Sequence, residues 1–248
     1  MANSFRVVIP VRYASSRLPG KPLLTFQHKP IIEHVYKNAC ESNAESVLIA
    51  TDDERIAQAA KKFGADVCMT SSDHLSGTDR ITEVVEQQGW SEDEVIVNVQ
   101  GDEPQMPPAN IKQVAELLLN NNSAVIGTLC HRIHTIQEYD DPNVVKVTKN
   151  SKGRALYFSR SSLPYIRNVD VRILKENSVF RHVGIYAYRV HYLKQFIKMP
   201  PSPLEMVEKL EQLRALENGD EIVIDECMEH PGIGVDTMDD YHRLKISS

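Results

Sequence analysis

The sequence is poor in cysteine and has no paired cysteine motif. Its four cysteines, Cys40, Cys68, Cys130 and Cys227, stand far apart, and none belongs to a Cys-x-x-Cys pair. This spacing argues against a disulfide-bonded secreted protein. Cys68 and Cys130 lie in apolar runs, so we expect them to be reduced core residues of a cytosolic protein.

The sequence also has no apolar run long enough to span a bilayer. Residues 1–4 lack the charged and apolar regions of a signal peptide and lead directly into a predicted strand. We therefore expect a cytoplasmic protein without membrane insertion. Internal repeats and low-complexity segments are absent as well.

The charge balance is slightly acidic. The 248 residues carry a net charge of −6, and 42% are hydrophobic and 25% charged, as is usual for a soluble globular protein. The negative balance argues against a general nucleic-acid-binding surface, so we expect no nucleic-acid partner. Any phosphate-binding site must be a local cluster of lysines and arginines.

Residues 95–104, Val-Ile-Val-Asn-Val-Gln-Gly-Asp-Glu-Pro, organise the rest of the chain. The β-branched run that begins them predicts a strand buried on both faces, and Gly101 and Pro104 end it. Asp102 then lies at the carboxyl end of a central strand, where open α/β sheets bind ligands. Its carboxylate suits a divalent cation, whereas the alternative is a solvated strand-to-helix turn.

A basic loop follows the first predicted strand, Phe5 to Val11. Arg12, Arg17 and Lys21 lie within ten residues of one another, together with two serines and a glycine. The loop is no Walker A motif, because Gly-x-x-x-x-Gly-Lys-Ser/Thr is missing. Three cations and free backbone N–H groups nevertheless suit a triphosphate. The alternative is a solvated loop.

The first half alternates predicted strands and helices, which favours a mainly parallel sheet in an α/β fold. In the polar loop 71–80, Thr78 or Asp79 is the expected cap of a helix that ends near Gly89. The N-terminus of this helix, with Arg80 beside it, could bind an anion or a polar base, or it could simply be capped.

The second half changes pattern. Residues 143–148 and 155–159 predict a β-hairpin, and residues 181–188 predict a strand that carries His182 as either a site residue or a core histidine. One helix is expected from the Ser202 cap to Gly219, with a buried stripe that includes Val207. Asp236 either caps the last helix or binds a cation.

These motifs together resemble the cytidylyltransferases that make CMP-activated 3-deoxy-manno-octulosonate (Kdo). The resemblance covers nearly the whole chain. It rests on residues 10–22, Ser76-Gly-Thr-Asp-Arg80, Asn98-Val-Gln-Gly-Asp-Glu-Pro104, Tyr157-Phe-Ser-Arg160, Arg181-His-Val-Gly-Ile-Tyr186, residues 208–214 and Gly234-Val-Asp-Thr237. It implies a single nucleotidyltransferase domain with a smaller β-hairpin and helix lobe, about residues 131–200, for acceptor binding and dimerisation. It also implies a homodimer in the cytoplasm that serves lipopolysaccharide synthesis.

The resemblance assigns roles to particular residues. Asp102 and Asp236 become Mg²⁺ ligands and, with Lys21, the catalytic group. The residues expected to contact CTP are Arg12, Arg17, Lys21, Ser76, Arg80 and Gln100. Arg160 and His182 are expected to bind the sugar carboxylate. The sugar hydroxyls are expected to contact Tyr188, Glu211 and Gln212.

Two other interpretations stay open. The acceptor could be another acidic sugar, such as 8-amino-Kdo or a sialic acid. The chain could also be a catalytically silent nucleotide-binding module, although the presence of Lys21, Asp102 and Asp236 together argues against it.

Overall fold

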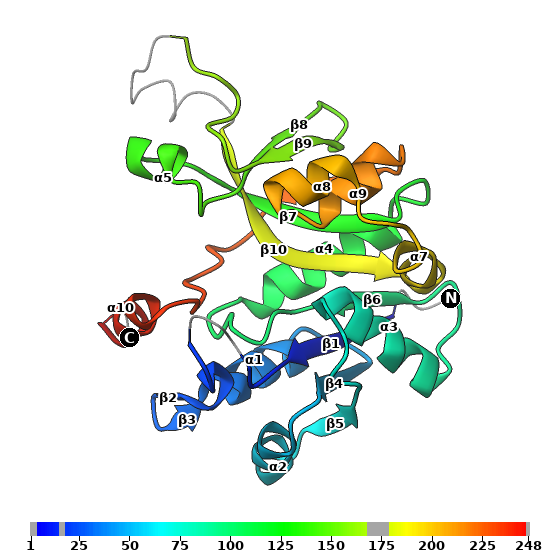
Figure 1. Ribbon diagram of the computed structural model, residues 1–248, viewed down its shortest axis with the longest axis vertical. Coiled ribbons are helices and arrows are strands. Elements are labelled where there is room, and N and C mark those ends of the chain that lie inside the picture. Colours follow the sequence, from blue (N-terminus) through cyan, green and yellow to red (C-terminus); the bar gives the residue numbers. More distant parts are fainter. Residues whose placement is uncertain (1–3, 15–17, 168–178, 247–248) are drawn as a thin grey trace.

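A mainly parallel sheet forms the centre of the molecule, as predicted. The computed structural model describes residues 4–14, 18–167 and 179–246 (Figure 1). The main strands follow the order β11-β7-β10-β6-β1-β4-β5. They are β11 (Ile222–Glu226), β7 (Ile126–Arg132), β10 (Phe180–Arg189), β6 (Val95–Asn98), β1 (Phe5–Val11), β4 (Ser46–Thr51) and β5 (Asp66–Met69). Only β10 runs antiparallel to its neighbours in this path.

Helices cover both faces of this sheet. Val7 and Ile9 of β1 face the core on the side of α1 (Ile31–Cys40), α2 (Glu54–Lys62) and α4 (Pro108–Leu119). Val8 faces the other side, where α3 (Gly77–Gln88), α7 (Val190–Phe196) and α9 (Gln212–Glu217) contribute apolar residues. The strand alternates between two cores because successive side chains point to opposite faces. Cys68 and Cys130 are free and buried, as expected of core residues.

The predicted hairpin consists of β8 (Lys146–Lys149) and β9 (Ala155–Ser159), and it extends the sheet through pairing of β8 with β10. Beside it, α5 (Ile136–Asp140) belongs to a small separate core of Ile133, Tyr139, Ile166 and Val179. Part of the expected 131–200 lobe has this small core, whereas the hairpin residues Val147, Ala155 and Phe158 pack in the core of the central sheet, of which β10 is a strand.

The helix predicted from Ser202 to Gly219 is wrong in its middle. The Ser202–Glu205 capping box is present, but α8 (Pro203–Glu208) ends at Lys209, whose φ is 55°. The chain then starts α9, and Val207 is 81% exposed instead of buried. The Glu205 carboxylate pairs with Arg214, whose Nε and Nη2 donate to it at 2.7 and 2.5 Å. This ion pair folds α9 back beside α8 (Figure 1).

The C-terminal segment returns to the N-terminal half. There α10 (Met238–Ile246) lies beside the short ribbon β2 (Thr25–Phe26) and β3 (Lys29–Pro30), which follows the 3-10 turn Lys21–Leu23 (Figure 1). Tyr241 donates its hydroxyl to the Thr25 carbonyl at 2.6 Å, and Val235 packs in the same small core. These contacts place the segment around Asp236 next to Lys21. No helix in the described ranges is long and apolar enough to cross a bilayer.

Candidate active site

A cavity of about 310 Å³ opens at the carboxyl ends of β1 and β6. Six of the residues predicted for nucleotide, metal or catalysis line it together, namely Arg12, Lys21, Arg80, Gln100, Asp102 and Asp236. They come from four separate segments of the chain, which meet here because parallel strands end at one edge of the sheet. Arg17 lies outside the described residues.

Close backbone approach shapes this cavity. A Cβ added to Gly101 would lie 2.7 Å from Val11 Cγ2 and 3.3 Å from the Pro10 carbonyl oxygen. A side chain at this position would therefore force the ends of β1 and β6 apart. Glycine lets Asp102 follow the strand directly while the floor of the cavity stays open.

Lys21 lies between the two aspartates. Its Nζ donates to Asp102 Oδ2 at 2.6 Å and to Asp236 Oδ1 at 3.3 Å, and the residue is only 8% exposed. Asp236 is held there by a hydrogen bond from the Val235 N–H to the Asp102 carbonyl at 2.9 Å. At the start of α10 the Thr237 hydroxyl accepts from the Asp240 N–H at 3.2 Å, so Thr237 makes a capping contact of the kind that was the alternative role for Asp236.

The two aspartates fit a hard divalent cation. Their oxygens converge on one cationic group, the Lys21 ammonium, which marks a place where positive charge is stabilised. Among the described residues no cluster of three or more His, Cys, Asp or Glu side chains is arranged to hold a metal. Mg²⁺ needs no such cluster, because it commonly takes one or two carboxylates and completes its shell with water and phosphate oxygens.

Glu103 is a third acidic residue of this site that the sequence reasoning did not select. A Cβ on Gly234 would lie 2.7 Å from Glu103 Oε1, so the carboxyl group packs directly beneath the segment that leads to Asp236. Burial, followed by the charge of Asp102, raises the pKa of Glu103 to about 8. Glu103 is thus mainly protonated at neutral pH and adds little negative charge to that of Asp102 and Asp236.

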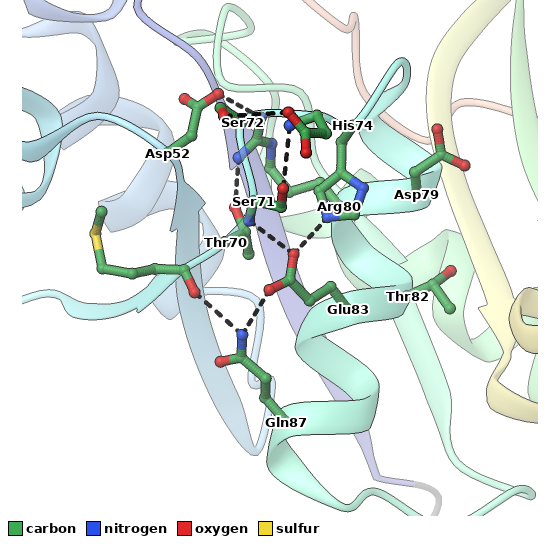
Figure 2. A network of polar contacts seen from close by, with 12 residues as sticks. Asp52, Thr70, Ser71, Ser72, His74, Asp79, Arg80, Thr82, Glu83 and Gln87 are labelled. Carbon is green, nitrogen blue, oxygen red and sulfur yellow. Dashed lines mark hydrogen bonds and ion pairs between the residues drawn. The ribbon is translucent and has the colours of Figure 1, made fainter.

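Arg80 is a buried support of the cavity wall. Only 2% exposed, it donates Nη2 to Asp52 Oδ2 at 2.9 Å and Nη1 to the Thr70 hydroxyl (Figure 2). The neighbouring loop is tied down separately, since Glu83 accepts from the Ser71 N–H at 2.8 Å and contacts His74. The guanidinium therefore holds β4, the loop and α3 together at the edge of the cavity.

The expected cap of α3 is corrected by the structure. Ser76, and neither Thr78 nor Asp79, is the N-cap, and it forms a capping box with Asp79. The capping box satisfies the N–H groups of Ser76 and Asp79, and it leaves the predicted anion site at this end of α3 a prediction. Gly77 lines the cavity, and Arg12 reaches across it to donate Nη2 to the Leu75 carbonyl at 3.1 Å.

Arg160 lies in the hairpin lobe, outside the lining of the cavity. Its Nε donates to the Glu208 carbonyl at 2.8 Å and its Nη1 to the Pro142 carbonyl at 3.1 Å. The Glu208 carboxylate in turn accepts from the Arg160 N–H and the Ser159 hydroxyl. The end of β9 is thereby fastened to α8, with donor nitrogens of Arg160 at the junction.

His182 is neutral and oriented by Thr128. Burial, aided by Arg181, lowers the pKa of His182 to about 3. Its Nε2 lies 2.8 Å from the Thr128 hydroxyl, whose single proton goes to the Ile185 carbonyl at 2.7 Å. Nε2 is then the donor, which leaves Nδ1 as an acceptor. A neutral ring of this kind suits a sugar hydroxyl better than the predicted carboxylate.

The other predicted sugar residues are mostly buried. Tyr188 is 3% and Gln212 is 6% exposed. Tyr186 packs between His182 and Tyr188, with ring centroids 5.2 and 5.7 Å away, and is partly exposed. Of the two tyrosines, Tyr186 is the more accessible. Because alternate side chains of a strand lie on the same face, the selection of His182 could also have indicated Tyr186. Glu211 lies where α9 begins and accepts from Thr78.

Comparisons with known proteins agree on one family. A family model described as cytidylyltransferase matches residues 6–222. The 3-deoxy-manno-octulosonate cytidylyltransferase of Thioalkalivibrio sulfidiphilus is 50% identical, with 98% of both chains covered. That of Haemophilus influenzae is 48% identical, with 98% of this chain and 97% of the relative covered.

Solved structures give the same picture. A CMP:2-keto-3-deoxy-manno-octonic acid synthetase in complex with CTP superposes with a TM-score of 0.89 at 41% identity, with 98% of both chains covered. A cytidylyltransferase from Leptospira borgpetersenii shares the fold alone, at a TM-score of 0.63 and 17% identity, over 98% of this chain and 85% of that one.

Proposed function

The chain belongs to the cytidylyltransferase family, and from this we propose that it transfers CMP from CTP to the anomeric hydroxyl of Kdo. The observation that carries the proposal is the cavity in which Arg12, Lys21, Asp102 and Asp236 meet. A site of two carboxylates and two cations suits a triphosphate and its counterion, and it lies where α/β sheets bind ligands.

The reaction is a direct displacement at phosphorus. The anomeric oxygen of the sugar forms a bond to the α-phosphorus of CTP, the bond from that phosphorus to the α,β-bridging oxygen breaks, and pyrophosphate leaves. The hydroxyl proton is lost to solvent or to pyrophosphate, so no covalent enzyme intermediate is required. Such a transfer depends mainly on positioning and on stabilising charge.

The cationic side chains stabilise the charge of the triphosphate. Lys21 is held at one edge by two aspartates, and its ammonium provides three donors in a nearly buried place. Arg12 also lines the cavity, and its guanidinium, which donates Nη2 to the Leu75 carbonyl, can add charge-assisted hydrogen bonds to phosphate. Arg80 and Gln100 line the wall, and Ser76 and Arg17 complete the set that we assign to the nucleotide.

We propose Asp102 and Asp236 as the ligands of Mg²⁺, the expected cofactor. Bound there, the ion would neutralise charge on the phosphate oxygens. The protein itself contributes two carboxylates that converge at one point, a buried carboxyl at Glu103 that stays mainly neutral, and the Lys21 ammonium beside the two carboxylates.

The acceptor is placed by the lobe. Arg160 carries the positive charge for the sugar carboxylate, whereas the neutral His182 accepts a hydrogen bond from a sugar hydroxyl at Nδ1. Glu211 and Gln212, at the start of α9, are assigned to further sugar hydroxyls. Tyr188 was predicted for the same role but is buried, and its stacked neighbour Tyr186 is partly exposed.

We also propose a cytoplasmic homodimer that serves lipopolysaccharide synthesis. Exposed apolar side chains support a dimer. Leu156 on β9 is 57% exposed, and Met206 and Val207 on α8 are 52% and 81% exposed. β9 and α8 are neighbours (Figure 1), since Ser159 at the end of β9 donates its hydroxyl to the Glu208 carboxylate at the end of α8. Light scattering should give twice the mass of the chain, and a monomer at micromolar concentration would contradict the proposal.

An acceptor panel tests the function. The protein is incubated with CTP, Mg²⁺ and either Kdo, 8-amino-Kdo or N-acetylneuraminate, and pyrophosphate release is measured. We expect the highest kcat/KM with Kdo. A preference for 8-amino-Kdo or sialic acid would reassign the acceptor, and CTP binding without pyrophosphate release from any acid would indicate a silent nucleotide-binding module.

A further inference from the structure

A short hydrogen bond joins the start of α3, at the nucleotide cavity, to the start of α9, where the acceptor residues Glu211 and Gln212 lie. The Thr78 hydroxyl donates to Glu211 Oε2 at 2.5 Å, across 133 positions of sequence. Thr78 is in the first turn of α3, directly after Gly77, which lines the cavity. Glu211 lies in the break between α8 and α9, where it directly precedes the first residue of α9. The bond therefore connects two elements that face different substrates.

Thr78 is suited to act only through its neighbours. It is 3% exposed, so it does not offer its hydroxyl to a ligand. Besides Glu211, its side chain has a polar contact with the Tyr188 phenol. Two residues assigned to the acceptor, Glu211 and Tyr188, thus meet at one threonine of the nucleotide-side helix.

We propose that Thr78 is a positioning residue, which fixes the Glu211 carboxylate for the acceptor sugar and links its placement to the end of α3 at the nucleotide cavity. This inference rests on the proposed function, because it takes Glu211 to contact the sugar. The chain reaches Glu211 through a break and not along a continuous helix, since Lys209 has a left-handed φ of 55° and α8 buries no residue. The Thr78 hydroxyl fixes the carboxylate at this break.

The surroundings of Glu211 indicate what the hydroxyl does electrostatically. Burial raises the pKa of Glu211, and hydrogen bonds from Thr78 and then Ser76 counteract this rise. Arg214, with Nη2 4.0 Å from Glu211 Oε1, also favours the ionised form, while Asp79 opposes it. The phenols of Tyr186 and Tyr188 face the same carboxylate and remain neutral, because burial raises the pKa of both. Loss of the Thr78 hydroxyl should therefore raise the pKa of Glu211 further.

The test compares Thr78→Val, which is isosteric but has no hydroxyl, with Thr78→Ser, which retains it. Thr82→Val is the matched control, because Thr82 is equally buried in α3 and donates only to the Thr78 backbone carbonyl. We expect Thr78→Val to raise KM for Kdo about tenfold, as is typical for a hydrogen bond to a charged group, and to leave KM for CTP within about twofold. Thr78→Ser and Thr82→Val should resemble the wild type in both constants.

The pH profile provides a second readout. The acidic limb of kcat/KM for Kdo should move to higher pH in Thr78→Val and stay in place in Thr82→Val. Unchanged KM and an unchanged acidic limb in a folded Thr78→Val protein would overturn the proposal. An equal rise of KM for CTP and Kdo would do the same, because it would indicate general damage to α3.

A double-mutant cycle with Glu211→Ala separates this proposal from the function on which it rests. If Thr78 acts through Glu211, then adding Thr78→Val to Glu211→Ala should change KM for Kdo by less than about twofold. If Glu211→Ala alone has no effect on Kdo, the assignment of Glu211 to the sugar fails. If Glu211→Ala impairs Kdo use but Thr78→Val adds its full effect in both backgrounds, only the positioning role fails.

Discussion

Replacing Lys21 by methionine should separate catalysis from stability. Methionine keeps an unbranched apolar stem where Lys21 is only 8% exposed, but it removes the ammonium that lies 2.6 Å from Asp102 and 3.3 Å from Asp236. The fold loses one partly exposed ion-pair network, while the triphosphate loses a donor that is already in position.

The two effects differ in size. The side chains of Asp102 and Asp236 are 29% and 53% exposed, so water screens the pairs and we expect a stability loss of about 1 kcal/mol. For a chain of this size that is a fall of about 2–4 °C in Tm. Loss of a positioned donor to developing negative charge typically costs about 2.7–4 kcal/mol, or a fall in kcat/KM of about 10²–10³-fold.

The assay is steady-state pyrophosphate release with CTP varied at saturating Kdo, beside a thermal melt. Lys194→Met is the control, because Lys194 donates to Glu92 at the same 2.6 Å but lies outside the cavity. It should melt like Lys21→Met and keep normal kinetics. A Lys21→Met protein with unchanged kcat/KM for CTP would refute the assignment of Lys21 to the phosphates.

Three further substitutions test other parts of the account. Asp236→Asn should reduce Mg²⁺-dependent turnover at least about 100-fold with little change in Tm, whereas a destabilised but active variant would contradict a role in metal binding. Arg160→Lys should raise KM for Kdo more than KM for CTP, because a point charge does not replace a planar fork; equal effects on both constants would argue against this assignment. Arg214→Met leaves the Glu205 carboxylate, 13% exposed, without its bidentate partner, and urea denaturation should show a loss of about 3–5 kcal/mol; less than 1 kcal/mol would contradict it.

The first half of the fold and the nucleotide side of the site could be predicted from sequence because local signals suffice there. The β-branched run before Gly101 and the alternation of strands and helices place Asp102 at the carboxyl edge, and the structure brings Lys21 and Arg12 to the same cavity. Asp236 could be selected only through resemblance. Its position depends on a small core in which Val235 and Tyr241 pack against Leu18, Phe26 and Ile31, residues more than 200 positions away in the sequence.

The second half was less predictable because tertiary contacts override local preference. A capping box and helical periodicity favour one helix after Ser202, but the Glu205–Arg214 pair and the burial of Leu210 and Leu213 break it at Lys209. The neutrality of His182 likewise follows from burial against Thr128, which no local pattern encodes.

The central claim is the transfer of CMP to Kdo at this site, and ³¹P NMR of one reaction mixture tests it most directly. With CTP, Kdo and Mg²⁺, we predict that the β- and γ-phosphorus signals convert to pyrophosphate while the α-phosphorus becomes a sugar phosphodiester, and that Asp102→Asn abolishes both changes. Formation of CDP and inorganic phosphate, or an unchanged CTP spectrum with the wild-type protein, would contradict the account.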